Sequence, residues 1–150
     1  MIQSPNQIRQ QLQYKIVVFT NGCFDVIHPG HTYILERAKA LGDVLIVGLN
    51  SDASVKRIKG LSRPIFNQND RAEILTALKS VDYVTIFEED TPLKLIEFFR
   101  PDVLVKGGDW PVEKIVGYDF VASYGGMVKS IPYIQGYSTT HIIEKIQKNL

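Results

Sequence analysis

Five short runs of apolar residues recur along the chain, separated by longer segments of mixed character. The runs are rich in Val and Ile and do not alternate with polar residues, which is typical of strands covered on both faces of a parallel sheet. They are residues 15–19, 44–49, 83–87, 103–106 and 127–131. The pattern therefore predicts a sheet of five buried strands.

Between these runs, apolar residues return every three or four positions, which is the period of a helix with one buried face. The clearest such segments are 33–41 and 70–78. Further helices are predicted to start at Ser4-Pro5, at Thr91-Pro92 and at Ser138, because Ser and Thr cap helix N-termini and Pro fits the first turn. Residues 54–69 show neither period and are predicted to form a loop.

Strands that alternate with helices are joined by right-handed crossovers in a parallel sheet. Residues 1–150 are therefore predicted to form one α/β domain, a doubly wound parallel sheet with helices on both faces, with residues 1–14 as a helical extension. No repeat or long linker divides the chain. With 150 residues, 45% of them hydrophobic, it can bury a sizeable core.

The charge balance argues against several classes of function. Lys and Arg number 17 and Asp and Glu 16, so we expect no nucleic-acid or membrane surface, and any anion site must be a local arrangement. Cys23 is the only cysteine and cannot form an internal disulfide, which is typical of a reducing compartment. With no leader and no apolar run of membrane-spanning length, we expect a cytoplasmic protein.

The first predicted strand leads into a segment rich in candidate chemistry, Thr20 to Leu35. Ligands of such sheets bind beyond the carboxyl ends of the strands, and the following helix start favours a phosphate. His28 and His31 are three residues apart, so both rings can stabilise charge that grows on one phosphate. Alternatively, one ring caps the turn and the other is a surface residue. A metal site with Cys23 would lack a fourth ligand, so we expect no protein-bound metal.

Two later segments can extend this site. Residues 136–140 combine a glycine, a helix cap and two hydroxyls, which suits a polyphosphate, although an ordinary helix cap is the alternative. In Val105–Trp110, two glycines let a planar base lie against the backbone and Lys106 can reach a phosphate. An ordinary glycine turn is the alternative there. The basic residues of 54–69, which include Lys56, Lys59 and Arg63, suit a phosphorylated ligand.

These motifs resemble those of the HxGH nucleotidyltransferases, the cytidylyltransferase-like superfamily. The likeness rests on Thr20-Asn21-Gly22-Cys23-Phe24-Asp25, His28-x-Gly30-His31 and Ser138-Thr139-Thr140. Within that superfamily the chain is most similar to the D-glycero-D-manno-heptose 1-phosphate adenylyltransferases, the adenylyltransferase domains of ADP-heptose synthases. The passages that carry this closer likeness are 50–54, 59–64, 70–73, 87–92 and 103–109.

The resemblance implies a Rossmann-like fold and transfer of AMP from ATP, with Mg²⁺, to a sugar 1-phosphate, which releases pyrophosphate. It makes His28 and His31 the catalytic residues that stabilise the pentacoordinate phosphorus. Together, the motifs and the resemblance assign nucleotide binding to Asn21, Gly22, Cys23, Phe24, His28, Gly30, His31, Lys106, Gly107, Asp109, Ser138, Thr139 and Thr140. They assign acceptor binding to Asp25, Lys56, Lys59, Arg63 and Arg71, with Lys56 also a candidate catalytic residue.

The sequence also departs from related enzymes. Glycerol-3-phosphate cytidylyltransferases carry an Arg where this chain has Tyr133, which disfavours the cytidylyltransferase interpretation. Many heptose enzymes are fused to a sugar kinase, whereas this chain has only a short predicted helix before its first strand. We therefore expect a separate kinase to supply the acceptor. The resemblance also implies that the chain forms a homodimer. Glycerol phosphate, a phosphopantetheine or a flavin mononucleotide are alternative acceptors. A non-catalytic nucleotide-binding α/β module is the alternative from another class, and the intact pair of histidines argues against it.

Overall fold

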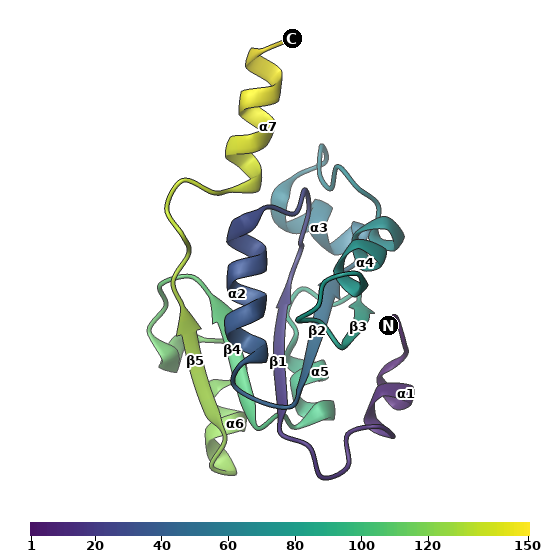
Figure 1. Cartoon of the computed structure of the whole chain (residues 1–150), viewed down its shortest axis with the longest axis vertical. Helices are drawn as coiled ribbons and strands as arrows, with labels where there is room; N and C mark the ends of the chain where they lie inside the picture. Colours follow the sequence, from purple (N-terminus) through teal and green to yellow (C-terminus); the bar gives the residue numbers. More distant parts are fainter.

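A five-stranded, all-parallel sheet forms the centre of the structure, a computed structural model that describes all 150 residues (Figure 1). The strands lie in the order β3-β2-β1-β4-β5. All five predicted strands are confirmed, with differences only at their ends. Their bounds are β1 (Val17–Gly22), β2 (Val44–Asn50), β3 (Tyr83–Phe87), β4 (Val103–Gly107) and β5 (Met127–Ile131).

Helices connect these strands, as the periodicity predicts. They are α1 (Pro5–Arg9), α2 (Pro29–Lys39), α3 (Asp52–Lys59), α4 (Gln68–Thr76), α5 (Leu93–Phe99), a 3-10 turn (Val112–Lys114), α6 (Tyr118–Ser123) and α7 (Thr139–Lys148). Ser4 and Ser138 cap α1 and α7 through their side chains, as predicted. At α5 the cap position is Pro92 and no side chain caps the helix, so the cap predicted at Thr91 is wrong.

The predicted loop over 54–69 is also wrong in its first half, because α3 extends to Lys59. Within α3 only Ser54 and Val55 are buried, and Lys56, Arg57 and Lys59 are all exposed. A helix with so narrow an apolar face leaves almost no periodic signal in the sequence. Ser51 caps it by accepting a hydrogen bond from the backbone N–H of Ser54.

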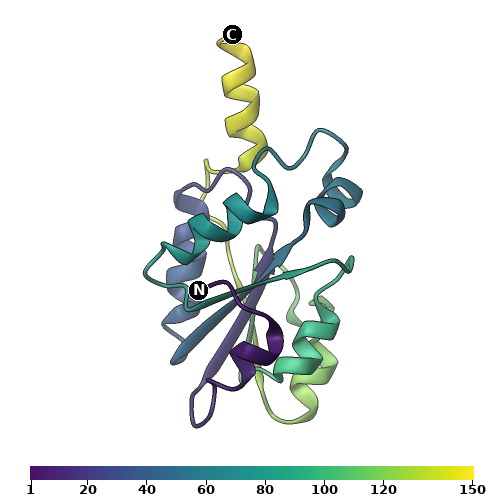
Figure 2. The same cartoon turned by 90° about the vertical axis from the view of Figure 1, so that its right-hand side faces the viewer.

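Two hydrophobic cores lie on opposite faces of the sheet. Each face is covered by its own layer of helices (Figure 2). Helices α2 and α4 cover one face, where Leu35 and Leu75 pack with strand residues such as Val18. Helices α1, α5 and α6 cover the other face, where Ile96 packs with Phe19. Successive residues of β1, Val18 and Phe19, thus enter different cores and are both fully buried. This confirms the doubly wound α/β fold and explains why the strands read as continuous apolar runs.

Residues 1–14 are built into this fold. Ile2 forms a parallel bridge with Val84, and the N–H of Gln3 donates to the Val84 carbonyl at 3.1 Å, so this segment covers the outer edge of β3. Ile8 of α1 is fully buried in the second core. The extension therefore adds both an edge contact and a core residue.

The chain path places a topological switch point between β1 and β4. From β1 the chain moves outward through β2 to β3, and it then crosses back to β4 and continues to β5 on the other side. At such a point the adjoining loops diverge and leave a crevice beyond the carboxyl ends of the strands. Helix α7 begins beside this crevice and extends away from the body of the molecule (Figures 1 and 2). None of the helices combines the length and apolar composition needed to cross a bilayer.

Candidate active site

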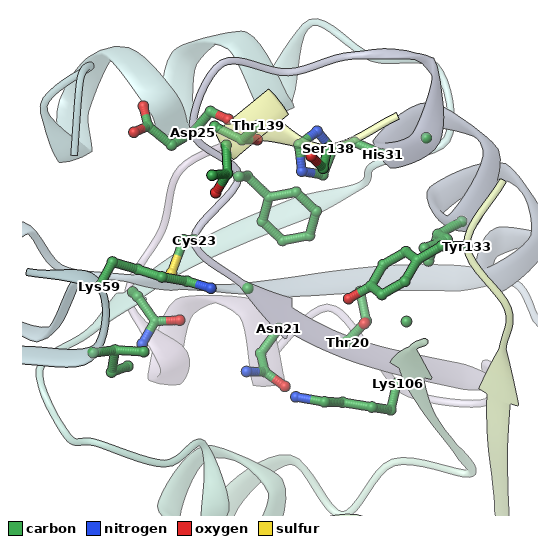
Figure 3. Close-up of a pocket in the computed structure, with 18 of the residues that line it drawn as sticks. Thr20, Asn21, Cys23, Asp25, His31, Lys59, Lys106, Tyr133, Ser138 and Thr139 are labelled. Carbon is green, nitrogen blue, oxygen red and sulfur yellow. Dashed lines mark hydrogen bonds between the residues drawn. The ribbon is translucent and has the colours of Figure 1, made fainter. Parts of the chain in front are cut away.

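A cleft of about 500 Å³ opens at the switch point. Its floor is the ends of β1, β2 and β4, and its walls come from the loop after β1, from α3 and from the start of α7 (Figure 3). Most of the predicted site residues line it together: Asn21, Gly22, Cys23, Phe24, Asp25, His28, Gly30, His31, Lys59, Arg63, Lys106, Gly107, Ser138, Thr139 and Thr140. Segments more than a hundred residues apart in the sequence therefore meet in one cleft.

The two histidines hold each other and the helix start in a fixed arrangement. The N–H of Gly30 donates to Nδ1 of His28 at 3.1 Å, and the N–H of His28 donates to Nδ1 of His31 at 3.2 Å. The ring centroids lie 3.9 Å apart. Because each Nδ1 accepts a hydrogen bond, each neutral ring carries its proton on Nε2. His28 and His31 thus cap α2, and both line the cleft, so the capping role and the role as phosphate donors are compatible.

The same environment keeps the histidines uncharged. Burial, together with the charge of His28, lowers the pKa of His31 to about 4, and Asp25 opposes this only in part. Burial also lowers the pKa of His28. At neutral pH both rings are therefore neutral Nε2–H donors. Such donors can stabilise negative charge that develops on a phosphate.

Gly30 is required by the position of the first histidine. A Cβ on this residue would lie 2.8 Å from Cε1 and 2.9 Å from Nδ1 of the His28 ring, and 3.1 Å from Cβ of Tyr137. The ring of Tyr137 stacks on His28, with centroids 6.0 Å apart and 15° between the planes. His28 is therefore held between the backbone of α2 and an aromatic ring. Sequence reasoning missed Tyr137, whose only signal is an aromatic residue next to Ser138.

The loop between β1 and α2 has an unusual backbone. Phe24 and Val26 have φ angles of 48° and 50°, which is rare for residues other than glycine and most costly for a β-branched side chain. Such conformations cluster at functional sites, although Tyr14 and Arg100 also adopt them, away from the cleft. The turn places Phe24 under Gly22, where a Cβ would lie 2.9 Å from its ring, and against His31, with ring centroids 5.5 Å apart. The strained loop thus supports the second histidine.

Cationic side chains give the cleft a positive field although the whole chain is nearly neutral. Lys59 and Lys106 extend into the cleft from opposite sides, and neither amino group is paired with a carboxylate (Figure 3). Burial lowers the pKa of Lys106; Cys23 opposes this and Lys59 adds to it. An anion placed between the two amino groups would relieve their repulsion. The cleft is therefore suited to phosphate groups.

Asp25 positions the loop after α3. Its carboxylate is buried and accepts the N–H of Ile65 at 2.7 Å, the N–H of Phe66 at 3.0 Å and Nε of Arg63 at 3.3 Å. Its carbonyl accepts the hydroxyl of Thr139 at 2.6 Å. With its oxygens engaged by three donors, Asp25 is a positioning residue that joins three walls of the cleft. It also lines the cleft, and its contact with the acceptor stays a prediction.

Three other expected site residues lie elsewhere. Arg71 is fully buried and donates to the carbonyls of Cys23 and Phe66 and to Asp52, so it supports the cleft from behind and cannot reach an acceptor. Lys56 is exposed on α3 and does not line the cleft. Asp109 is exposed beyond the end of β4 and does not line it either. All three positions are close to the site in the sequence, but none of the three residues lines the cleft.

The beginning of α7 completes the cleft. Ser138 accepts the N–H of His141 at 3.0 Å, which caps the helix, and Ser138, Thr139 and Thr140 all line the cleft. A helix of this length presents free N–H groups at its start. Tyr133, which stands on the path from β5 to α7, also lines the cleft and packs beside Gly107 and Gly108. Its aromatic ring offers a flat apolar surface near the end of β4.

Comparison with known proteins identifies the family. The cytidylyltransferase-like family model matches residues 19–145. The chain belongs to this family. It is 58% identical over 132 residues to the bifunctional protein HldE of Syntrophotalea carbinolica, and 55% identical over 139 residues to that of Geobacter sulfurreducens. These matches cover 88% and 93% of this chain but only 27% and 28% of the relatives, so the chain spans about a quarter of their length.

Solved structures agree with this assignment. The lipopolysaccharide core biosynthesis protein of Thermoplasma volcanium is 31% identical, with a TM-score of 0.64 over 83% of this chain and 99% of that protein. Pantothenate synthetase of Thermus thermophilus has a TM-score of 0.65 over 99% of this chain and 70% of its own, but at 15% identity it shows the fold alone. The chain is a nucleotidyltransferase with a Rossmann-like fold, and the resemblance that its motifs indicate is confirmed.

Proposed function

We propose that this nucleotidyltransferase transfers AMP from ATP to a sugar 1-phosphate, D-glycero-D-manno-heptose 1-phosphate, and releases pyrophosphate and an ADP-sugar. The identity of 54% or more to several proteins named HldE, over most of this chain, supports this choice of substrates. Tyr133 supports it as well, because the related cytidylyltransferases for glycerol 3-phosphate have a cation at this place. A kinase reaction would supply the sugar 1-phosphate.

The proposed reaction is a direct displacement at the α-phosphorus of ATP. An oxygen of the acceptor phosphate forms a bond to this phosphorus, and the bond to the oxygen that bridges to the β-phosphorus breaks. The Nε2–H groups of His28 and His31 donate to the α-phosphate oxygens as charge grows on them. The N–H groups and hydroxyls at the start of α7 hold the leaving pyrophosphate. Catalysis is thus positioning and electrostatic stabilisation, and no protein nucleophile is needed.

The acceptor phosphate is proposed to bind at Lys59 and Arg63. Nε of Arg63 is directed at Asp25, so its two terminal nitrogens, which have no partner within the chain, remain available to an anion. Asp25 fixes the direction of that guanidinium. Lys59 contributes a second positive charge from the end of α3.

Mg²⁺ is proposed to enter with ATP as part of the substrate. The chain offers it no set of carboxylates, since no three His, Cys, Asp or Glu side chains lie together in a way that would hold a metal ion. Asp25, the acid in the loop after β1, is buried and already accepts three hydrogen bonds within the chain. Phosphate oxygens and water are the usual ligands of Mg²⁺ in nucleotide sites and would hold it here.

The test is a pyrophosphate-release assay that crosses ATP, CTP, GTP and UTP with heptose 1-phosphate, glycerol 3-phosphate, phosphopantetheine and flavin mononucleotide. We expect strong turnover only with ATP and the heptose 1-phosphate, and none in a double variant with both His28 and His31 replaced by Ala. Strong turnover with CTP and glycerol 3-phosphate, and none with ATP and sugar phosphates, would overturn the proposal.

A further inference from the structure

One end of the cleft takes no part in the proposed phosphate chemistry. It lies between α3 and the loop that follows β3, and its lining residues are Asn50, Ile58, Asp90, Thr91 and Pro92. None of them is basic. The proposed site of the acceptor phosphate adjoins this end, because Lys59 directly follows Ile58 on α3 and both line the cleft. The part of the acceptor beyond its phosphate can therefore reach these side chains.

Asn50, the last residue of β2, offers a fixed hydrogen-bond acceptor. The residue is only 4% exposed, and its Nδ2 donates to Oγ of Ser54 at 3.2 Å. Ser54 gives its own hydroxyl proton to the carbonyl of Ser51 at 3.0 Å, so Oγ can only accept from the amide, which fixes the amide's orientation. Oδ1 of Asn50 accepts no hydrogen bond within the chain, whereas every fully enclosed side-chain N or O atom has a partner. This oxygen is therefore open to the cleft that Asn50 lines.

Asp90 offers a second acceptor, whose direction is set by α3. Nε of Arg57 donates to Oδ1 of Asp90 at 2.8 Å, and a terminal nitrogen of Arg57 donates to the carbonyl of Glu88. An exposed ion pair of this kind adds little to stability. Its two bonds nevertheless fasten the loop after β3 to α3 and leave Oδ2 of Asp90 without a partner within the chain.

The two acceptors lie along one side of α3. Asn50 contacts Ser54 and Asp90 contacts Arg57, and residues three apart share one side of a helix, about 4.5 Å apart along its axis. Ile58, one turn after Ser54, is 49% exposed and gives this end an apolar wall. Hydroxyl groups on a carbon ring match this arrangement, since hydroxyls donate to the two oxygens and C–H groups pack on Ile58. A second phosphate would be repelled by Asp90, and a cation gains little because Arg57 already neutralises that carboxylate.

We infer that this end of the cleft binds the hydroxyl groups of the acceptor, with Asn50 and Asp90 as hydrogen-bond acceptors and Arg57 as the residue that positions Asp90. The inference rests on the proposed function, because it concerns the sugar whose phosphate Lys59 and Arg63 are proposed to hold. It separates the choice of acceptor, made at this end, from the chemistry at the histidines. A phosphorylated compound without hydroxyls binds by its charge alone.

The test compares a sugar 1-phosphate with methyl phosphate by NMR chemical-shift titration, with and without a non-hydrolysable ATP analogue. The sugar is heptose, mannose or glucose 1-phosphate, whichever the wild-type chain binds most tightly. Methyl phosphate has the phosphate but no hydroxyls, so it reports on the phosphate site alone. Asn50→Ala, Asp90→Ala and Arg57→Ala should each raise Kd for the sugar phosphate on the order of 10-fold and leave Kd for methyl phosphate unchanged.

Two comparisons make the test specific. Arg57→Ala should have little further effect in a chain that already carries Asp90→Ala, because Arg57 acts through that carboxylate. Glu89→Ala is the matched control, since it removes an exposed acid next to Asp90 that does not line the cleft, and it should change neither Kd. Asp90 and Arg57 are exposed, so their variants should fold, which circular dichroism checks.

Three outcomes would overturn the inference. They are equal binding of the two ligands by the wild-type chain, variants that weaken methyl phosphate as much as the sugar phosphate, and tighter binding of phosphoethanolamine that depends on Asp90, which would make this a site for a cation. The titrations need no turnover. If they succeed while ATP and heptose 1-phosphate release no pyrophosphate, the proposed substrates are wrong and the hydroxyl site stands. If turnover occurs and Asn50→Ala and Asp90→Ala leave it unchanged, the proposed function stands and this inference is wrong.

Discussion

Gly30→Ala is the most direct test of how the active site holds its first histidine. The new Cβ would lie 2.8 Å from Cε1 of His28, whereas ordinary contacts of this kind begin at about 3.4 Å. The ring must therefore move by roughly 0.6 Å or more, and it weakens or loses the hydrogen bond from the N–H of Gly30 that fixes its tautomer. A catalytic group misplaced by about 1 Å costs on the order of 10²-fold in rate. We expect a fall in kcat of about that size, or about 2.7 kcal/mol in the barrier.

Stability should respond differently from activity. Residue 30 lies in the first turn of α2, where the preference for Ala over Gly, up to about 1 kcal/mol, roughly offsets the weakened cap hydrogen bond, so the melting temperature should change little. The assay is pyrophosphate release at saturating ATP and acceptor, with thermal unfolding followed on the same protein. A drop in kcat together with a large drop in melting temperature would indicate general damage instead.

A double-mutant cycle with His28→Ala makes the test specific. If Gly30→Ala acts by displacing the imidazole, it should have little further effect once the imidazole is gone, so the two changes should be strongly non-additive. Near-normal kcat in Gly30→Ala, or an equal loss of rate with and without His28, would refute the reasoning.

Four further expectations follow from the cleft. An NMR titration of the substrate-free chain should show His31 titrating near pH 4 rather than 6.5, because burial lowers its pKa. The ring is then neutral above about pH 4 and protonated below it. A titration midpoint near 6.5 would contradict this expectation. His31→Ala should lower kcat on the order of 10²-fold with a smaller change in KM for ATP, and a near-normal kcat would make the ring structural. Thr139→Ala should raise KM for ATP more than KM for the sugar phosphate. Lys59→Ala should raise KM for the sugar phosphate more than KM for ATP, and Lys56→Ala, the control, should change neither. Equal effects on the two substrates would show that Thr139 and Lys59 do not serve different substrates. Asp25→Ala leaves two backbone donors without partners and should lower the free energy of unfolding by about 2–4 kcal/mol in a denaturant titration, whereas wild-type stability would show that Asp25 does not hold the loop.

The sequence predicted the parts of the fold that depend on hydrophobic period. Residues of β1 alternate between two cores, as Val18 and Phe19 do, and so leave an unbroken apolar run that is easily recognised. Helix α3 was missed because it buries only Ser54 and Val55, which is too little for a period. The bridge from Ile2 to Val84 was missed for a related reason, since a single pairing between distant residues has no local pattern.

In the candidate site, too, the features with a local sequence pattern were predicted and those that depend on distant contacts were not. The spacing of His28 and His31 indicated that both rings would reach one ligand, and the cleft brings them together. The direction of each side chain depends on contacts across the fold, and no spacing encodes it. Arg71 was expected to face the acceptor because it is basic and near the site, but the carbonyls of Cys23 and Phe66 draw its guanidinium inward.

The floor and the outer walls of the cleft differ in how many packing and hydrogen-bond contacts hold them in place. Its floor is the end of β1, the central strand, which pairs with β2 on one side and β4 on the other and has a hydrophobic core on each face. Its outer walls, the loop after α3 and the start of α7, are exposed and held by a few polar contacts centred on Asp25. Backbone amides of β1 should therefore exchange with deuterium only through global unfolding. Those of the walls should exchange through local opening, which has a low free energy. A ligand that touches both must order the walls when it binds, so slow exchange in residues 61–66 and 136–141 would report occupancy of the cleft without any chemical turnover.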